Sequence, residues 1–130
     1  AELIQKAKEA REQAYAPYSG FHVGAALLCK DGTIFTGCNI ENSAYGPTNC
    51  AERTAIFKAV SEGFREFEAI AIISDSKQPT APCGVCRQVM AEFCDPETFR
   101  IVLMNGDGEI RDYLLKELLP LGFTGKALEK

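Results

Sequence analysis

Hydrophobic and polar residues follow one another along the chain with spacings that predict an alternation of helices and strands. Apolar and small residues recur at helical spacing in three segments, so we expect helices at residues 3–15, 50–62 and 83–93. Shorter runs of strand-forming residues predict five strands, at residues 23–29, 33–38, 69–73, 100–104 and 109–115. The third and fourth of these are continuously apolar, as expected for strands buried on both faces.

Turn-forming residues between these segments indicate how the strands pair. Asp31-Gly32 predicts a hairpin between the first two strands, and residues 105–108 predict a tight turn into an antiparallel edge strand. Pro17 is expected to end the first helix, and a short helical turn is expected near Leu118. Strand–helix–strand units with a hairpin at each edge predict a three-layer α/β/α sandwich around a mixed five-stranded sheet. Residues 1–130 contain no repeat or linker, so we expect a single domain.

Composition and charge narrow the class of protein. The 130 residues are 46% hydrophobic and 25% charged, which is typical of a globular domain and argues against disorder. No apolar run approaches the roughly 20 residues of a membrane span, and none resembles a secretion signal, so we expect a cytoplasmic protein without a membrane partner. The net charge of −4 does not suit a nucleic-acid partner.

Six cysteines are the unusual feature of this composition. In a short secreted chain they would indicate three disulfides, but a domain of this size folds without them, so metal binding or catalysis is the better interpretation. Cys83 and Cys86 stand three residues apart at the start of a predicted helix, where both sulfur atoms can bind one ion. The same spacing also occurs in redox dithiols and among ordinary core cysteines.

Cys50 begins another helix that follows a strand. Successive parallel strands place both helix N-termini at the carboxyl edge of the sheet, so Cys50, Cys83 and Cys86 can converge there. Three protein ligands with a fourth position open are the arrangement of a catalytic zinc ion. Three thiolates leave such a site with one excess negative charge, which the helix N-termini and the neighbouring Arg53 and Arg87 would offset. Each arginine could instead form a surface ion pair.

Glu52 lies two residues beyond Cys50, so the two side chains do not share a direction on the helix. A carboxylate that lies beside a zinc-bound water without binding the metal suits proton transfer. The alternative role is structural. Asn49 and Glu52 have the spacing of a capping box, and an acidic residue is favoured in the first turn of any helix.

The combination of Cys50-Ala51-Glu52 with Pro82-Cys83-Gly84-Val85-Cys86 resembles the zinc-dependent nucleoside and nucleobase deaminases. Longer stretches narrow this resemblance to the small, homotetrameric cytidine deaminases, namely residues 16–27, 37–42, 50–55, 83–89 and 117–120. The resemblance implies deamination of cytidine and 2′-deoxycytidine in pyrimidine salvage. It also implies one Zn²⁺ per chain and a homotetramer whose subunits share their active sites.

Each predicted site residue is carried over from that resemblance by its position. Cys50, Cys83 and Cys86 would hold the zinc ion, and Glu52 would move protons between the water, the ring nitrogen and the leaving amine. The Ala51 backbone N–H would meet the carbonyl oxygen of the pyrimidine.

Further substrate contacts are implied in two loops and near the C-terminus. Phe21 would pack on the pyrimidine, and Asn39 and Glu41 would hydrogen-bond the ribose hydroxyls. Tyr45 and Phe123 would be exchanged between neighbouring subunits to complete each pocket.

Other functions stay open at this point. A deaminase of bases within RNA or DNA fits the negative charge and the antiparallel edge strand less well. A deaminase of a nucleoside antibiotic is a closer alternative, and a non-enzymatic zinc or redox module would use only Cys83 and Cys86. The only histidine, His22, is expected to be exposed, and the other cysteines are expected to fill space in the core: Cys29, Cys38 and Cys94.

Overall fold

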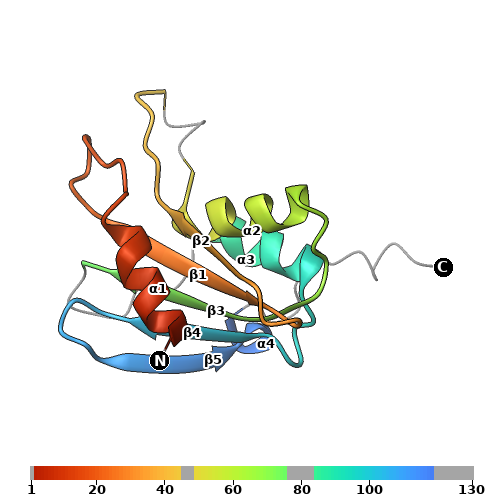
Figure 1. Ribbon diagram of the computed structural model, residues 1–130. Coiled ribbons are helices and arrows are strands. Elements are labelled where there is room, and N and C mark those ends of the chain that lie inside the picture. Colours follow the sequence, from red (N-terminus) through yellow and green to blue (C-terminus); the bar gives the residue numbers. More distant parts are fainter. Residues whose placement is uncertain (1, 45–48, 76–83, 119–130) are drawn as a thin grey trace.

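The computed structural model describes residues 2–44, 49–75 and 84–118, and its centre is a five-stranded sheet (Figure 1). The strands lie in the order β2-β1-β3-β4-β5. Their bounds are β1 Val23–Cys29, β2 Ile34–Cys38, β3 Phe67–Ser74, β4 Arg100–Met104 and β5 Ile110–Leu114. Every predicted strand is present with boundaries shifted by two residues at most, and the mixed sheet is confirmed.

Strand directions bring the ends of three strands to one edge of the sheet. β1 pairs antiparallel with both β2 and β3, β3 pairs parallel with β4, and β5 returns antiparallel along β4. Because β2, β3 and β4 therefore run in the same direction, their carboxyl ends lie at the same edge. Helix α2 (Ala51–Ser61) follows β2 and helix α3 (Gly84–Phe93) follows β3, so both helices begin at that edge.

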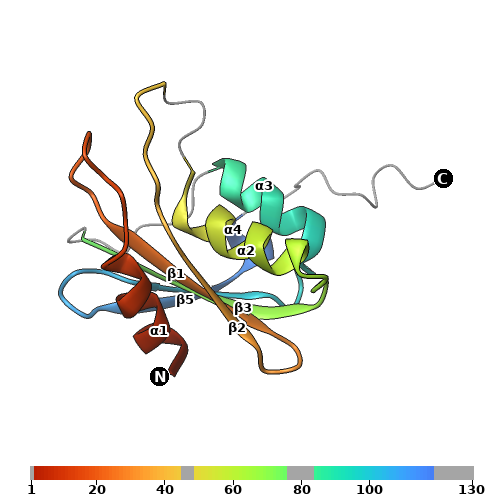
Figure 2. The same ribbon diagram turned by 45° about the horizontal axis from the view of Figure 1, so that its top comes forward.

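Helices cover both faces of the sheet (Figure 2). Helix α1 (Glu2–Arg11) packs over β1 and β3 on one face, while α2 and α3 pack on the other. A short helix, α4 (Leu115–Leu118), follows β5 and contacts α3. The predicted three-layer sandwich is thus confirmed. Among the described residues, no helix combines the length and the apolar character needed to cross a membrane.

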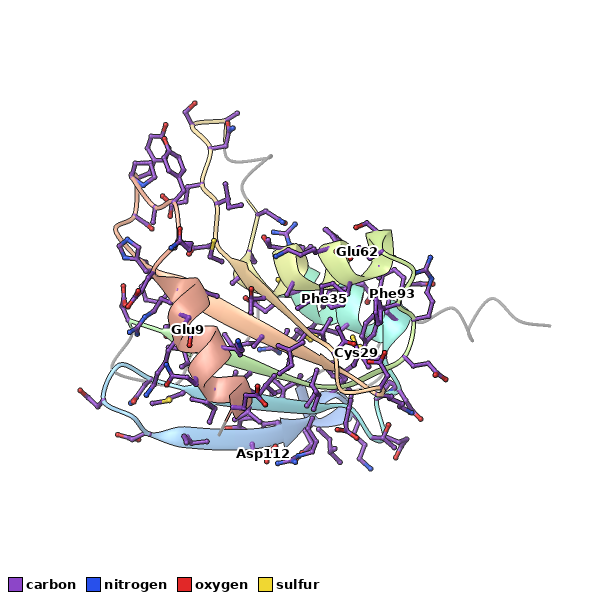
Figure 3. All side chains as sticks on the ribbon, viewed as in Figure 1. Glu9, Cys29, Phe35, Glu62, Phe93 and Asp112 are labelled. Carbon is purple, nitrogen blue, oxygen red and sulfur yellow. The ribbon has the colours of Figure 1, made fainter. Side chains whose placement is uncertain are left out.

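The larger part of the core lies between the sheet and the layer formed by α2 and α3. Phe35 and Cys29 point into this region (Figure 3). The ring of Phe35 meets the ring of Phe64 edge to face, with 4.9 Å between the two centroids. A smaller cluster under α1 consists of mostly small side chains, namely Ala7, Ala26, Ala71 and Ile73.

Helix α1 ends at Arg11, four residues before its predicted end at Tyr15. The chain at Tyr15 bonds to another segment instead of continuing the helix. The Tyr15 N–H donates to the Asn39 carbonyl oxygen at 2.9 Å, and the Glu41 N–H donates to the Tyr15 carbonyl oxygen at 2.8 Å. Tertiary hydrogen bonds therefore override the helical pattern, and the expectation that Pro17 ends this helix is wrong.

Gly24 and Gly37 allow helices to pack closely on opposite faces of the sheet. A Cβ atom at Gly37 would lie 2.5 Å from the carbonyl oxygen of Ala51 and 2.6 Å from the backbone nitrogen of Ala55, both in α2. A Cβ atom at Gly24 would lie 2.1 Å from the carbonyl oxygen of Ala7 in α1. No larger residue fits at either position unless a helix moves.

We expect Gly37→Ala to lower the free energy of unfolding by about 1–3 kcal/mol, because α2 must shift to accept the added methyl group. Gly24→Ala should destabilise the protein for the same reason through α1. Thr36→Ala, which adds no atom beside α2, should cost less than either. Urea unfolding measures all three variants, and a Gly37→Ala variant as stable as the parent would contradict the close packing.

Candidate active site

The N-terminal ends of α2 and α3 bring two predicted metal ligands to the carboxyl edge of the sheet. Cys50 is the residue that caps α2, and Cys86 lies in the first turn of α3, fully buried. The expectation that both helices begin at one edge is confirmed. Cys83, the third predicted ligand, lies outside the described residues.

Arg53 links the two thiols. Its Nη2 atom donates to the Sγ atom of Cys50 at 3.3 Å. This hydrogen bond is the main cause that raises the pKa of the guanidinium, and Cys86 acts in the same direction. The Nε atom of Arg53 is buried and has no hydrogen-bond partner among the described residues. A positive charge therefore lies against both sulfur atoms, where it can offset the negative charge of thiolates.

Glu52 is buried beside the same sulfur atoms, with only 5% of its surface exposed. Burial raises the pKa of its carboxyl above the usual range, and the charge of Cys50 acts in the same direction. Hydrogen bonds from its own backbone N–H and from Cys86 oppose this rise. A raised pKa brings the carboxyl closer to the pH at which it can both accept and return a proton.

The capping-box alternative for Glu52 is wrong. The residue that caps α2 is Cys50, which has an extended backbone (φ −78°, ψ 155°) and whose side chain makes no capping hydrogen bond. Asn49 lies one residue further out, and its side-chain amide donates to the Thr54 hydroxyl at 3.0 Å. Glu52 is therefore not the partner of Asn49 at the start of this helix.

Thr54 is a site residue that the sequence pattern did not single out. Its hydroxyl oxygen lies 3.1 Å from the carbonyl oxygen of Cys38, at the end of β2, and 3.1 Å from that of Cys50. One hydroxyl thus ties the end of β2 to the start of α2 and holds Cys50 in place. A signal was present, because a threonine four residues into a helix can bond back to the carbonyl of residue i−4.

Ala51 is the first residue of α2, and its side chain is fully buried. The N–H groups of the first helical turn lack partners within the helix and carry the positive end of the helix dipole. The predicted contact between the Ala51 N–H and a substrate carbonyl therefore suits this position.

Two loops rise side by side from this edge and carry further predicted substrate residues (Figures 1 and 2). Phe21 lies in the loop between α1 and β1, and Asn39 lies in the loop after β2. The Nδ2 atom of Asn39 donates to the Phe21 carbonyl oxygen at 2.8 Å, and its Oδ1 atom accepts the Val23 N–H at 2.9 Å. The structure therefore brings Phe21 and Asn39 together.

Glu41 uses both carboxylate oxygens to hold the tip of the first loop. Its Oε1 atom accepts the N–H groups of Tyr18 and Ser19 at 2.9 and 3.1 Å, and Oε2 accepts the Ser19 hydroxyl. The bond from the Ser19 hydroxyl is the main reason that the pKa of Glu41 lies below its usual range. A carboxylate offers about four lone-pair positions, so Glu41 retains capacity for a ribose hydroxyl.

Of the remaining predicted site residues, the structure describes Arg87 but not Tyr45 or Phe123. The Nη1 atom of Arg87 donates to the Leu118 carbonyl oxygen at 2.7 Å and joins α3 to α4. Tyr45 and Phe123, like Cys83, lie outside the described residues. Their roles stay predictions.

The other cysteines differ from Cys50 and Cys86 in their surroundings. Cys29 and Cys94 are buried, as predicted, whereas Cys38 is half-buried. Burial raises the pKa of all three thiols, to about 12 for Cys94. The thiolate, which is the form that binds metal, is therefore disfavoured at these three positions. His22 has 45% of its side chain exposed, which confirms its expected position at the surface.

The residues present fit a zinc ion. Within residues 2–44, 49–75 and 84–118, no group of three metal-binding side chains occurs, and the third predicted ligand falls between these ranges. The described part of the site nevertheless has the chemistry that zinc requires. Two thiols lie at helix N-termini. Arg53 donates to the thiol of Cys50, and one of its buried nitrogen atoms has no described partner.

Comparisons with known proteins show similarity to one family over most of the chain. Residues 1–102 match the family described as the cytidine and deoxycytidylate deaminase zinc-binding region. A cytidine deaminase from Sporosarcina psychrophila is 57% identical over 126 residues, which span 97% of this chain and 92% of the relative. A blasticidin-S deaminase from Bacillus cereus is 34% identical over 131 aligned residues, which span 95% of this chain and 91% of that one.

A solved structure extends the comparison to three dimensions. The crystal structure of a cytidine deaminase from Burkholderia pseudomallei superposes with a TM-score of 0.91 at 54% sequence identity. The match covers 94% of this chain and 97% of that one. The two chains therefore share the whole fold described above.

Proposed function

The chain belongs to the cytidine and deoxycytidylate deaminase zinc-binding family, and we propose that it hydrolyses cytidine and 2′-deoxycytidine to uridine and 2′-deoxyuridine with release of ammonia. The observation that carries this proposal is the buried carboxyl of Glu52 beside the thiols of Cys50 and Cys86. Hydrolytic deamination of a pyrimidine requires a proton-transfer group close to a metal ion. Glu52 lies beside two candidate metal ligands at the start of a helix, so it suits this reaction.

Cys50, Cys83 and Cys86 would hold one zinc ion per chain. When bound, zinc supplies a water acidic enough to ionise at about neutral pH. Arg53 offsets the charge of the thiolates through its bond to Cys50 and its contact with Cys86. We also propose that Arg87, in α3, offsets part of the thiolate charge. Its side chain bonds α3 to the end of α4.

Glu52 carries the proton through the reaction. Its carboxylate takes a proton from the attacking water and delivers it to N3 of the pyrimidine, which makes C4 more electrophilic. After the water oxygen has added to C4, the Glu52 carboxylate takes the second proton from the new C4 hydroxyl and gives it to the amine. The C4–N bond then breaks, ammonia leaves and the C4 carbonyl forms. The burial that raises the pKa of Glu52 makes its carboxylate a stronger base toward the water proton.

The substrate pocket is formed by the start of α2 and by the two loops. The Ala51 N–H would bind the carbonyl oxygen of the pyrimidine, and Phe21 would pack on the ring. Asn39 and Glu41 would bind the ribose hydroxyls, and their bonds within the loops support this by fixing both side chains.

We also propose a homotetramer in which subunits exchange Tyr45 and Phe123 to complete each pocket. Large apolar side chains on α2 and α3 support contact between copies, because Phe57 is 45% exposed and Val85 is 57% exposed. The described cysteines are free thiols. This is typical of the reducing cytoplasm, where we place the enzyme in pyrimidine salvage.

The direct test follows ultraviolet absorbance as purified protein meets cytidine, 2′-deoxycytidine, cytosine and adenosine in separate reactions. We expect a change with both cytosine nucleosides, matched by one ammonia released per nucleoside, and none with adenosine. No change with either cytosine nucleoside would overturn the proposal.

A nucleoside antibiotic that contains cytosine is the second candidate substrate, because one relative is named a blasticidin-S deaminase. The much higher identity to a protein named cytidine deaminase favours the natural nucleoside. Adding blasticidin S to the same assay decides between them, since a larger kcat/KM for the antibiotic than for cytidine would favour the second candidate.

A further inference from the structure

Asp75 is an exposed carboxylate that the proposed reaction does not use, and it lies directly after β3. Its Oδ2 atom accepts the backbone N–H of His22 at 2.9 Å and lies 3.1 Å from the Nδ1 atom of the same residue. Its Oδ1 atom faces the Nη1 atom of Arg11, at the end of α1, at 3.6 Å. One side chain thus joins the ends of β3 and α1 to the residue that enters β1.

The position of Asp75 follows from the sheet register. β1 and β3 are antiparallel, and their last pair at this edge is Val23 beside Ser74. The next residues along the two strands are His22 and Asp75. There the ladder of paired residues has ended, and the Asp75 side chain accepts the next N–H. The link between the two strands therefore extends one residue further, to His22, the neighbour of Phe21.

The segment that Asp75 holds leads into β1 and, at residues 18–22, contains no helix or strand. Every backbone N–H from residue 18 to residue 23 has an acceptor. The acceptors are Glu41 for residues 18 and 19, the Ala16 carbonyl oxygen for residue 20, the Ser19 hydroxyl for residue 21, Asp75 for residue 22 and Asn39 for residue 23. Among these acceptors, Asp75 alone comes from the end of β3.

This origin matters because β3 is the strand that leads to the metal site. The other acceptors belong to the two loops, so they bond the loops to themselves and to each other. Asp75 instead connects the loop that carries Phe21 to the strand from which the chain continues to Cys83 and α3. Its bond to His22 therefore links the neighbour of Phe21, the proposed ring contact, to the end of β3.

We propose that Asp75 is a positioning residue for substrate binding, which holds Phe21 at the distance from the metal site that the pyrimidine ring needs. The inference rests on the proposed function, and it assigns the effect to the backbone bond with His22. The Arg11 pair is partly exposed, and ion pairs of that kind contribute little. Because ring packing acts in the ground state and the transition state alike, its loss raises KM more than it lowers kcat.

The test compares two substitutions of Asp75 in the full chain with zinc bound. Asp75→Ala should raise the KM for cytidine about tenfold while kcat stays within about twofold and zinc stays at one ion per chain. Asp75→Asn should keep a KM near that of the parent, because its side-chain carbonyl oxygen can still accept the His22 N–H.

Two control variants separate the backbone bond from other effects of charge. His22→Ala removes the ring but keeps the backbone N–H, so its KM should match the parent. Asp112 is an exposed carboxylate on the edge strand β5 (Figure 3), where it pairs with Arg100 of β4. The KM of Asp112→Ala should also match that of the parent. A rise in KM for His22→Ala equal to that of Asp75→Ala would overturn the assignment to the backbone bond.

A second measurement does not depend on activity. Amide hydrogen exchange of residues 18–23 should be faster in Asp75→Ala than in the parent, with exchange in α2 unchanged. An unchanged KM together with unchanged exchange would overturn the inference, and so would a fall of kcat in step with lost zinc. Inactivity of the parent toward cytidine would instead contradict the proposed function, while the exchange result would still decide whether Asp75 holds this segment.

Discussion

Replacing Glu52 by glutamine is expected to lower kcat for cytidine about a thousandfold while one zinc ion per chain stays bound. Glutamine has nearly the same shape as glutamate and can occupy the same buried position. It cannot take a proton from water or return one to the leaving amine, so the proposed proton transfers lose their carrier. Steady-state kinetics and metal analysis on the same sample measure both quantities.

Glu62→Gln provides the matched control for this variant. Glu62 is the exposed residue that ends α2, at the opposite end of the helix from Glu52 (Figure 3). The substitution makes the same chemical change at the C-terminal cap of the same helix without touching the site, so kcat should remain near that of the parent. A Glu52→Gln variant with a near-normal rate would contradict the proton-transfer role.

Replacing Cys86 by alanine is expected to reduce zinc content far below one ion per chain and to reduce deamination to background. Cys86 is fully buried at the start of α3 and shares Arg53 with Cys50, so its loss removes one of the three proposed ligands and leaves the guanidinium charge less compensated. Zinc bound by two protein ligands dissociates far more readily than zinc bound by three. Metal analysis after dialysis measures the loss.

Cys94→Ala is the control, because Cys94 is also buried and directly follows the same helix. Its thiol has a pKa of about 12 owing to burial, so it is not expected to bind metal. We expect about 1 kcal/mol of lost stability with zinc and activity retained. A Cys86→Ala variant that keeps zinc and turnover would contradict the ligand assignment, and a metal-free parent with a reducible disulfide would favour a redox module.

The sequence predicted the architecture well because strong local patterns determine it. The apolar run in β3 allows little besides a buried strand, and the glycine turns at residues 31–32 and 105–108 define both outer hairpins. The expected direction of the parallel strands was then enough to place Cys50 and Cys86 at one edge. That placement depends on chain direction alone, so it did not require any side-chain detail.

The features that the sequence did not predict depend on contacts between distant segments. The helical pattern of residues 3–15 is real, but bonds from Tyr15 to the loop after β2 end the helix at Arg11. The roles of Thr54 and Asp75 likewise depend on which carbonyl or N–H lies opposite them in the folded protein. Local spacing contains no information of that kind.

The bonded segment from residue 18 to residue 23 also affects how a ligand enters the pocket. A loop that must order itself around a ligand loses conformational entropy on binding, and that loss weakens affinity. Here the backbone N–H groups already have acceptors, so little ordering remains to be done when the nucleoside arrives. Association can then proceed at the rate of diffusive encounter with the opening, without waiting for the loop to fold.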